Sequence, residues 1–231
     1  MSAAPGLHEP FDTLGRQREA AAFGLWIFIA SEILFFGALL LGYIVYRFLY
    51  PGGFEAAGRE ASLVHGTVNT LVLLTSSATM AVAAWAGHTA TEPEDARDAR
   101  AHRHACRAAR RHVVVALGAT ALLGLAFLAV KGVEYRDDLA RHLLPFDDAF
   151  PLDATGARIF FSFYWLLTAI HALHLSIGIG AVLYALAGVV RERPGWARTA
   201  TLHVLGLYWH LVDLVWIFLF PLFYLLGRGG A

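Results

Sequence analysis

Five long apolar blocks, separated by short polar segments, dominate the sequence. They extend over Ala21–Tyr46, Val64–Gly87, His112–Val133, Ala157–Val190 and Ala200–Gly227. A helix needs about 20 mainly apolar residues to cross the hydrocarbon core of a bilayer, and each block is long enough. The fourth is longer than a core of about 30 Å requires, so its helix is expected to tilt or to project into water. The pattern predicts an all-α membrane protein, a bundle of five transmembrane helices that forms a single domain over residues 1–231.

The segments between the blocks predict loops and an orientation. PGGFEAAGREAS and YRDDLARHLLPFDDAFPLDATG are rich in Gly, Pro and Asp, which is typical of surface loops. Lys and Arg are more frequent on the cytoplasmic side of membrane proteins. Eleven of the 18 Lys and Arg residues lie on the side that includes the N-terminus, and seven lie on the other side. The sequence therefore predicts a cytoplasmic N-terminus and a C-terminus outside.

The composition agrees with a membrane protein and argues against other classes. The chain is 58% hydrophobic and only 16% charged, with a mean hydropathy of +0.56. The formal net charge is zero, which argues against a nucleic-acid partner. Cys106 is the single cysteine, so neither an intrachain disulfide nor a cysteine-based metal cluster is expected.

Ionisable side chains interrupt three of the apolar blocks. Glu32 lies in the first block, His171 and His174 in the fourth, and His210 and Asp213 in the fifth. Such groups are rare inside membranes because each costs several kcal/mol unless it is paired or hydrated. Within each pair the two residues are three positions apart, so they share one helix face. We expect all five near the middle of the bilayer, facing a shared interior where Glu32 is protonated or hydrogen-bonded to another helix.

Three interpretations of these groups stay open from the residues alone. The groups can simply hold the helices together, or they can form the relay of a proton-coupled transporter, although the inverted repeat of many transporters is missing. Alternatively, His174 and His210 on different helices can ligate a haem. A copper or zinc site is not expected, because no cluster of cysteine or methionine accompanies the imidazoles. No residue pattern predicts a catalytic nucleophile.

Five segments resemble subunit III of the haem–copper oxidases. They are FIASEILFFG at 28–37, HGTVNTLVLLTSS at 65–77, KGVEY at 131–135, FFSFYWLLTAIHALHLSIG at 160–178 and LYWHLVDLVWIFLFPLFYLL at 207–226. The similarity touches the predicted spans in order, and the WHLVDLVW and HALH segments are the most specific.

The resemblance implies a non-catalytic accessory subunit of a respiratory cytochrome c oxidase in the inner membrane of a bacterium. Members of this family bind no haem or copper; these cofactors are expected in the partner subunits. The chain is expected to pack directly against subunit I, to assemble with subunit II and other respiratory subunits, and to bind phospholipid. Support of proton uptake and of stability during turnover is expected as well. Subunit III of a quinol oxidase and the related protein of a nitric oxide reductase system are the alternatives.

The resemblance also implies roles for residues. Glu32 looks like the family's intramembrane glutamate that carbodiimides modify, so it is the proton-related candidate. Arg191 and Arg193 resemble basic positions that meet lipid headgroups. The other recurring polar positions of the family correspond to Glu134, His171, His174, His210 and Asp213. The resemblance implies no catalytic residue and no metal ligand in this chain.

Two departures from the family pattern change these expectations. Mitochondrial-type members have seven spans, and this chain lacks the first two, which form one arm of a lipid cleft. The cleft is therefore expected to be smaller here, or to be completed by a neighbouring chain. His203 also stands at a position that is commonly Glu in the family, so a carboxylate pair there is not expected.

Overall fold

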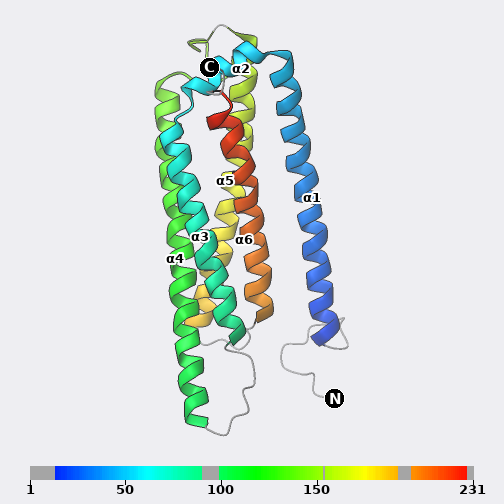
Figure 1. The fold of residues 1–231 in the computed structure, drawn as a ribbon, viewed down its shortest axis with the longest axis vertical. Coiled ribbons are helices and arrows are strands. Elements are labelled where there is room, and N and C mark those ends of the chain that lie inside the picture. Colours follow the sequence, from blue (N-terminus) through cyan, green and yellow to red (C-terminus); the bar gives the residue numbers. More distant parts are fainter. Residues whose placement is uncertain (1–13, 90–98, 153, 192–198, 228–231) are drawn as a thin grey trace.

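The computed structural model describes residues 14–89, 99–152, 154–191 and 199–227, and almost all of these residues are helical (Figure 1). Five helices in this part of the chain are long and apolar enough to cross a membrane. The helices are α1 Leu14–Leu49, α2 Pro51–Glu60, α3 Leu63–Thr89, α4 Ala99–Ala140, α5 Thr155–Val190 and α6 Thr199–Phe220, followed by the π-helix η1 Pro221–Leu225. The prediction of an all-α membrane protein with five transmembrane helices is confirmed. The side of the membrane on which each end lies stays a prediction.

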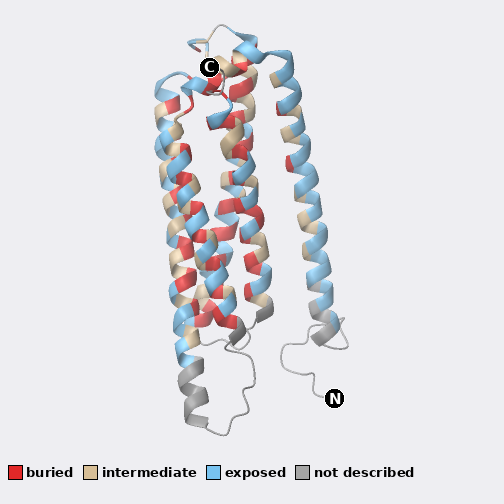
Figure 2. Cartoon of the chain, in the orientation of Figure 1, coloured by how far each residue is buried: buried red, intermediate tan, exposed pale blue. Residues whose placement is uncertain are grey.

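Four of the long helices form a bundle, and α1 stands beside it. Helix α3 packs against α4 and α6, while α5 packs against α4 and α6 from the other side. Helix α1 contacts α5 and α6, and it is largely exposed (Figure 2). In its most apolar stretch only 11% of residues are buried, compared with 44% in α6. Because a bilayer surrounds these helices, the exposed apolar face of α1 is available to lipid or to a partner chain.

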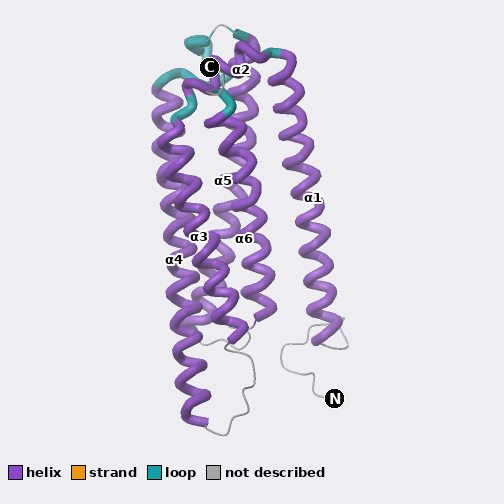
Figure 3. Tube along the Cα trace, viewed as in Figure 1, coloured by secondary structure: helices purple, strands orange, loops and turns teal. Residues whose placement is uncertain are grey.

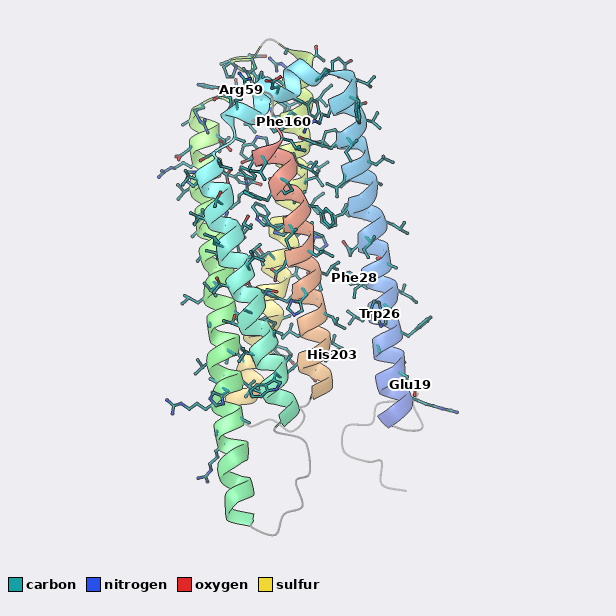
Figure 4. All side chains as sticks on the ribbon, viewed as in Figure 1. Glu19, Trp26, Phe28, Arg59, Phe160 and His203 are labelled. Atoms are coloured by element: carbon teal, nitrogen blue, oxygen red, sulfur yellow. The ribbon has the colours of Figure 1, made fainter. Side chains whose placement is uncertain are left out.

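Aromatic rings join α1 to the bundle at the end where α2 lies. Tyr43, Phe54, Phe160 and Phe223 form a closed ring of contacts, with neighbouring centroids 5.2–5.7 Å apart. Three of these contacts are nearly perpendicular and all are edge-to-face, which is the favourable geometry for aromatic pairs. Figure 4 labels Phe160 beneath α2. The ring connects α1, α2, α5 and η1, so aromatic contacts hold four elements together at this end of the molecule.

Farther along α1, the contact with the bundle is thinner. Phe28 lies on the side of α1 that faces α6, and its ring stacks on Tyr208 at 5.9 Å (Figure 4). Trp26, two residues earlier, is 61% exposed. The same helix therefore changes from an anchored segment near Tyr43 to a mainly lipid-exposed one near Trp26.

The prediction of a surface loop at PGGFEAAGREAS is wrong, because residues 51–60 form α2. Pro51 begins this helix at a position where its missing N–H costs nothing. The glycines that suggested a loop are contact points instead: a Cβ on Gly53 would lie 2.7 Å from the Cα of Gly156, and a Cβ on Gly58 would lie 2.7 Å from the Cα of Gly227. Glycine at these positions lets α2 lie directly on the backbones of α5 and the C-terminal segment.

Helix α4 is longer than the predicted third span of 112–133. It begins at Ala99, and residues 90–98 lie outside the described residues. At the other end it continues to Ala140, where the N–H of Leu143 binds the carbonyl oxygen of Asp138 and the N–H of His142 binds that of Leu139. This is a Schellman cap, and His142 occupies its left-handed position with φ 56°. Glu134 therefore lies inside a helix and not at its end.

Hydrogen bonds fix the loop after α4 at several positions. This loop lies at the end of the bundle where the described loops gather (Figure 3). The indole N–H of Trp165 donates to the carbonyl oxygen of Leu143 at 3.2 Å. The Arg158 guanidinium donates to the carbonyl oxygen of Pro145 at 2.7 Å. The Asp147 carboxylate accepts from the N–H of Ala149 at 2.9 Å and lies 2.8 Å from Nδ1 of His142.

Acidification is expected to loosen this loop at Asp147. The N–H of Ala149 and then the ring of His142 hold the pKa of Asp147 below its ordinary value. A carboxyl whose pKa is lowered by folding stabilises the fold fully above its unfolded pKa of about 3.9, and this contribution is lost as the pH falls through the lowered pKa. The hydrogen-exchange protection of the Ala149 amide should therefore be constant at neutral pH and fall below about pH 4. Asp147→Asn is neutral at every pH, so it should show weaker protection at neutral pH and little further loss in acid; wild-type protection that persists in acid would contradict the assignment.

Candidate functional site

The main polar site of the described chain lies inside the bundle near α2. Lys131, Glu134 and Asp138 lie three and four residues apart on α4, so they share one face of the helix. All three are at most 2% exposed. They face Tyr164 of α5 and Tyr224 of η1, which are also buried. Tyr224 reaches this position through η1, because Pro221 has no N–H and the chain continues from α6 as a π-turn.

The Lys131 ammonium group has a partner for each of its three donors. Nζ lies 3.0 Å from Oε2 of Glu134, 2.9 Å from the Tyr164 hydroxyl and 2.8 Å from the Tyr224 hydroxyl. The ring of Tyr164 lies 4.4 Å from Nζ and that of Tyr135 lies 5.0 Å away, both within the range of cation–π attraction. A buried charge is tolerated when it is paired and fully hydrogen-bonded, and Lys131 meets both conditions.

The two carboxyl groups extend the network toward the surface. Oε1 of Glu134 lies 2.7 Å from the Tyr224 hydroxyl and 2.9 Å from that of Tyr164. Oδ2 of Asp138 lies 2.9 Å from the same Tyr164 hydroxyl, and Oδ1 accepts from Arg141 at 2.6 Å. Arg141 is partly exposed, so the network runs from a buried lysine to the aqueous end of α4.

A polar pocket of about 530 Å³ adjoins this network. Its lining comes from α2, α3, α4 and the residues that directly follow α2 and α4, and consists of Glu60, Ala61, Ser62, His65, Glu134, Asp137, Ala140 and Arg141. Glu134 thus borders both the buried network and the pocket.

The family resemblance pointed to Glu134 but not to its partners. Lys131 lies within two residues of the end of the predicted third span at Val133, where a charged side chain is common. The spacing of Lys131, Glu134 and Asp138 was visible in the sequence and would have indicated one polar face if the helix had been extended. The participation of Tyr224 had no such signal, because it depends on the π-turn.

Glu32 lies beside an imidazole on another helix, without the hydrogen bond that was expected. Oε2 of Glu32 lies 3.2 Å from Nε2 of His174, although the atoms are not aligned as a hydrogen bond. Nδ1 of His174 lies 2.9 Å from the carbonyl oxygen of Ile170, which can only accept, so Nδ1 carries a proton. Nε2 of a neutral ring and a carboxylate would then both lack a proton. The two groups are placed to form an ion pair when the ring of His174 is protonated.

Of the other predicted polar residues, His171 lies apart from His210 and Asp213, which share Ser77 as a neighbour. The ring of His171 is buried between Phe127 and Trp216, and neither ring nitrogen has a hydrogen-bond partner. Nδ1 of His210 lies 2.8 Å from the Ser77 hydroxyl. Asp213 is 5% exposed and lies near Ser77, the residue whose hydroxyl His210 contacts. No hydrogen bond in the described chain connects these groups to Glu134.

Only one of the two basic candidates, Arg191, is among the described residues, and it lies at the far end of α5. Arg191 is exposed and caps this helix through its backbone N–H, which binds the carbonyl oxygens of Ala187 and Val189. Arg193 lies outside the described residues. Among the residues that the structure describes, no group of three His, Cys, Asp or Glu side chains is arranged to hold a metal ion.

Comparison with known proteins identifies the family. No protein-family model matches the chain. A probable cytochrome c oxidase subunit 3 of Mycobacterium leprae is 30% identical over 201 residues, which cover 87% of this chain and 85% of the relative. The cytochrome bo(3) ubiquinol oxidase subunit 3 of Pseudomonas aeruginosa is 27% identical over 206 residues, with 89% and 84% covered. A haem–copper oxidase subunit I+III of Aeropyrum pernix is 28% identical over 213 residues, which cover 87% of this chain and 22% of that longer protein.

The match to the Mycobacterium leprae relative covers most of both chains, and five helices are long and apolar enough to cross a membrane. Both findings agree with the resemblance of the five sequence segments to subunit III. The chain belongs to the subunit III family of the haem–copper oxidases.

Proposed function

We propose that the chain is the accessory subunit III of a respiratory cytochrome c oxidase in a bacterial inner membrane. The observation that carries this proposal is the match to cytochrome c oxidase subunit 3 of Mycobacterium leprae over most of both chains. In this role the chain packs beside subunit I, while haem and copper belong to partner subunits. The name of the Aeropyrum pernix relative, which combines subunits I and III, supports direct contact with subunit I.

The exposed faces of the structure support contact with both lipid and partner chains. The apolar face of α1 is free over most of its length within the chain (Figure 2). Arg191 is exposed at the end of α5, which is the predicted cytoplasmic side, where a basic side chain attracts anionic headgroups. We infer that phospholipid lies against α1 and that Arg191 is one of the residues that meet headgroups.

Glu32 is proposed to act as the proton-related group of this subunit. Glu32 lies 3.2 Å from His174, a second ionisable side chain, and it is within the α1 span, whose surroundings are otherwise apolar. A protonatable pair at such a place can exchange a proton with a neighbouring subunit without a redox centre of its own. This role supports turnover and is distinct from catalysis of oxygen reduction.

A quinol oxidase is the second candidate for the complex. The relative from Pseudomonas aeruginosa, whose name is that of a ubiquinol oxidase subunit, matches nearly as much of the chain. The two candidates differ in the electron donor, which contacts other subunits, so the present chain has the same role in both.

Purification of the tagged full-length chain from native membranes tests the proposal. In mild detergent we expect it to carry a large partner with haem, seen in the reduced-minus-oxidised optical spectrum. After a harsher wash, the haem should leave together with that partner, and the haem types should distinguish a cytochrome c oxidase from a quinol oxidase. Haem that stays with this chain alone would contradict the accessory role.

Glu32→Ala should shorten the active lifetime of the oxidase several-fold while leaving the initial rate of oxygen reduction close to wild type. The variant removes the carboxyl group that faces His174 and no cofactor ligand. The measurement is the number of turnovers completed before half of the activity is lost, followed with an oxygen electrode. Glu19→Ala removes an exposed carboxylate from the same helix before the span begins and serves as the control. An immediate large loss of rate in Glu32→Ala would argue for a catalytic role.

A further inference from the structure

The buried network near α2 contains more hydrogen-bond contacts than protons. Six contacts join the side chains of Lys131, Glu134, Asp138, Tyr164 and Tyr224. The ammonium group supplies three protons and each tyrosine hydroxyl supplies one, so one contact lacks a proton when both carboxyl groups are ionised.

The deficit is located at the Tyr164 hydroxyl. It lies 2.9 Å from Oε1 of Glu134 and 2.9 Å from Oδ2 of Asp138, and it already accepts from Lys131. One hydroxyl proton can be donated to only one of the two carboxyl oxygens. The other oxygen would face the hydroxyl oxygen without a proton between them, which is unfavourable in a buried site. A proton on one of the carboxyl groups completes the network.

We propose that Glu134, Tyr164 and Asp138 form a proton-binding site that holds one additional proton and exchanges it with water through the adjoining pocket. The proposal concerns residues other than Glu32 and lies at the end of the bundle where α2 and the C-terminal segment meet. It is therefore independent of the role proposed for Glu32.

Two arrangements of this site differ only in the position of protons. In the first, Oε1 of Glu134 carries the additional proton and donates it to Tyr164, while Tyr164 donates its own to Asp138. In the second, Oδ2 of Asp138 donates to Tyr164 and Tyr164 donates to Glu134. Conversion from the first to the second breaks the O–H bond of Glu134 and that of Tyr164 and forms those of Tyr164 and Asp138. No electron is transferred, and the number of protons is unchanged.

The charges around the site accommodate one additional proton. Lys131 and Arg141 balance the two carboxylates when both are ionised, so protonation leaves one excess positive charge. Glu60 of α2, whose Oε2 lies 3.6 Å from Arg141, offsets that charge from the pocket side, whereas Asp137 is paired with Arg136. Glu134 lies close to Lys131, and Asp138 lies close to Arg141. Either carboxyl group can therefore also be buried in its ionised form when the additional proton is released.

The remaining titratable groups that face the site come from α3, α4 and α5. His65 of α3 lines the pocket, with Nδ1 2.8 Å from the Ser62 hydroxyl. The hydroxyl of Tyr135 on α4 lies 2.6 Å from that of Thr168, so it takes no part in the deficit. His171 of α5 lies farther along the bundle against Phe127.

The pocket gives the site a route to water. Glu134 is 1% exposed, yet it lines the pocket together with Arg141, Asp137 and Glu60, which are polar and at least partly exposed. Water in the pocket can therefore deliver a proton to Glu134, and Tyr164 can pass it inward to Asp138. The same route in reverse releases it.

Infrared spectroscopy of the purified full-length chain in detergent tests the proposal. A protonated carboxyl group has a carbonyl stretch well separated from that of a carboxylate. At neutral pH we expect this band in the difference spectrum of wild type minus Tyr164→Phe, although that variant keeps both carboxyl groups. Loss of the hydroxyl removes the contact that requires the proton. In D2O the wild-type band should move to lower frequency, because the proton exchanges through the pocket.

Two further variants keep the test decisive. Tyr135→Phe removes a neighbouring hydroxyl that binds Thr168, and it should leave the band unchanged. Asp138→Asn supplies an amide that can donate to Tyr164, so it should fold normally and also lack the band. A band that persists in both Tyr164→Phe and Asp138→Asn, or is absent from wild type, would overturn the proposal. A wild-type band that does not move in D2O would overturn the exchange through the pocket.

Discussion

Replacing Lys131 with methionine should lower the free energy of unfolding by about 3–5 kcal/mol, the largest effect expected of any single change in this chain. The substitution leaves Glu134, which is 1% exposed, without the cation 3.0 Å away. The hydroxyls of Tyr164 and Tyr224 also lose their donor. A methionine fits the same space, so the loss comes from the uncompensated charge and not from a cavity. Denaturant titration of the protein in mixed micelles measures the change.

The double variant Lys131→Met, Glu134→Gln is the control for this result. Its glutamine is neutral and can still accept from both tyrosines, so it should recover most of the lost stability. Arg136→Met removes an exposed cation from the same helix and should change stability by less than about 0.5 kcal/mol. Equal losses in the single and double variants would show that Lys131 acts by packing alone.

Replacing Gly53 with alanine should destabilise the protein by about 1–3 kcal/mol, the cost of adding a methyl group to a filled contact. The new Cβ would lie 2.7 Å from the Cα of Gly156 and 2.9 Å from the backbone nitrogen of Ala157. Both are backbone atoms, so no side chain can turn aside to make room. Helix α2 must move away from α5, and the aromatic contact of Phe54 with Phe160 is disturbed as well. The midpoint of thermal unfolding in detergent measures the effect.

Gly52→Ala provides the matched control for this prediction. Gly52 is the neighbouring residue in the same helix, and a Cβ built there meets nothing within 4 Å. Both substitutions favour a helix equally, so any difference between them reports the contact with α5. We expect Gly52→Ala to be neutral or slightly stabilising. Similar behaviour of the two variants would mean that α2 is free to shift on the bundle.

The residue pattern was sufficient for the membrane-spanning architecture. Apolar runs of this length identify spans because lipid cannot satisfy the hydrogen bonds of the backbone, so a helix is required wherever the chain crosses. The same local argument failed at PGGFEAAGREAS. Gly and Pro favour turns in an isolated segment. Gly53 and Gly58 lie instead in a helix, where the absence of a side chain lets two other backbones approach.

In the candidate site, too, the sequence indicates some of the residues and only the structure identifies the others. Glu32 stands out in the sequence because a carboxylate in an apolar run is costly, and the structure brings it to His174. Lys131 and Asp138 did not stand out, because they lie near the end of a span where charged residues are common. Their importance depends on Tyr164 and Tyr224, which come from segments far away in the chain.

The sequence by itself determined the all-helical membrane class, the number of spans and the family, because each depends on local apolar runs or on ordered residue matches. Only the tertiary structure decided which polar groups meet. It separated His171, His210 and Asp213 from Glu134, and it placed Lys131 in a cage of tyrosines. The physical reason is that the energy of a buried polar group depends on the atoms within a few ångströms of it, and these atoms come from helices whose rotation and depth the packing of the bundle sets.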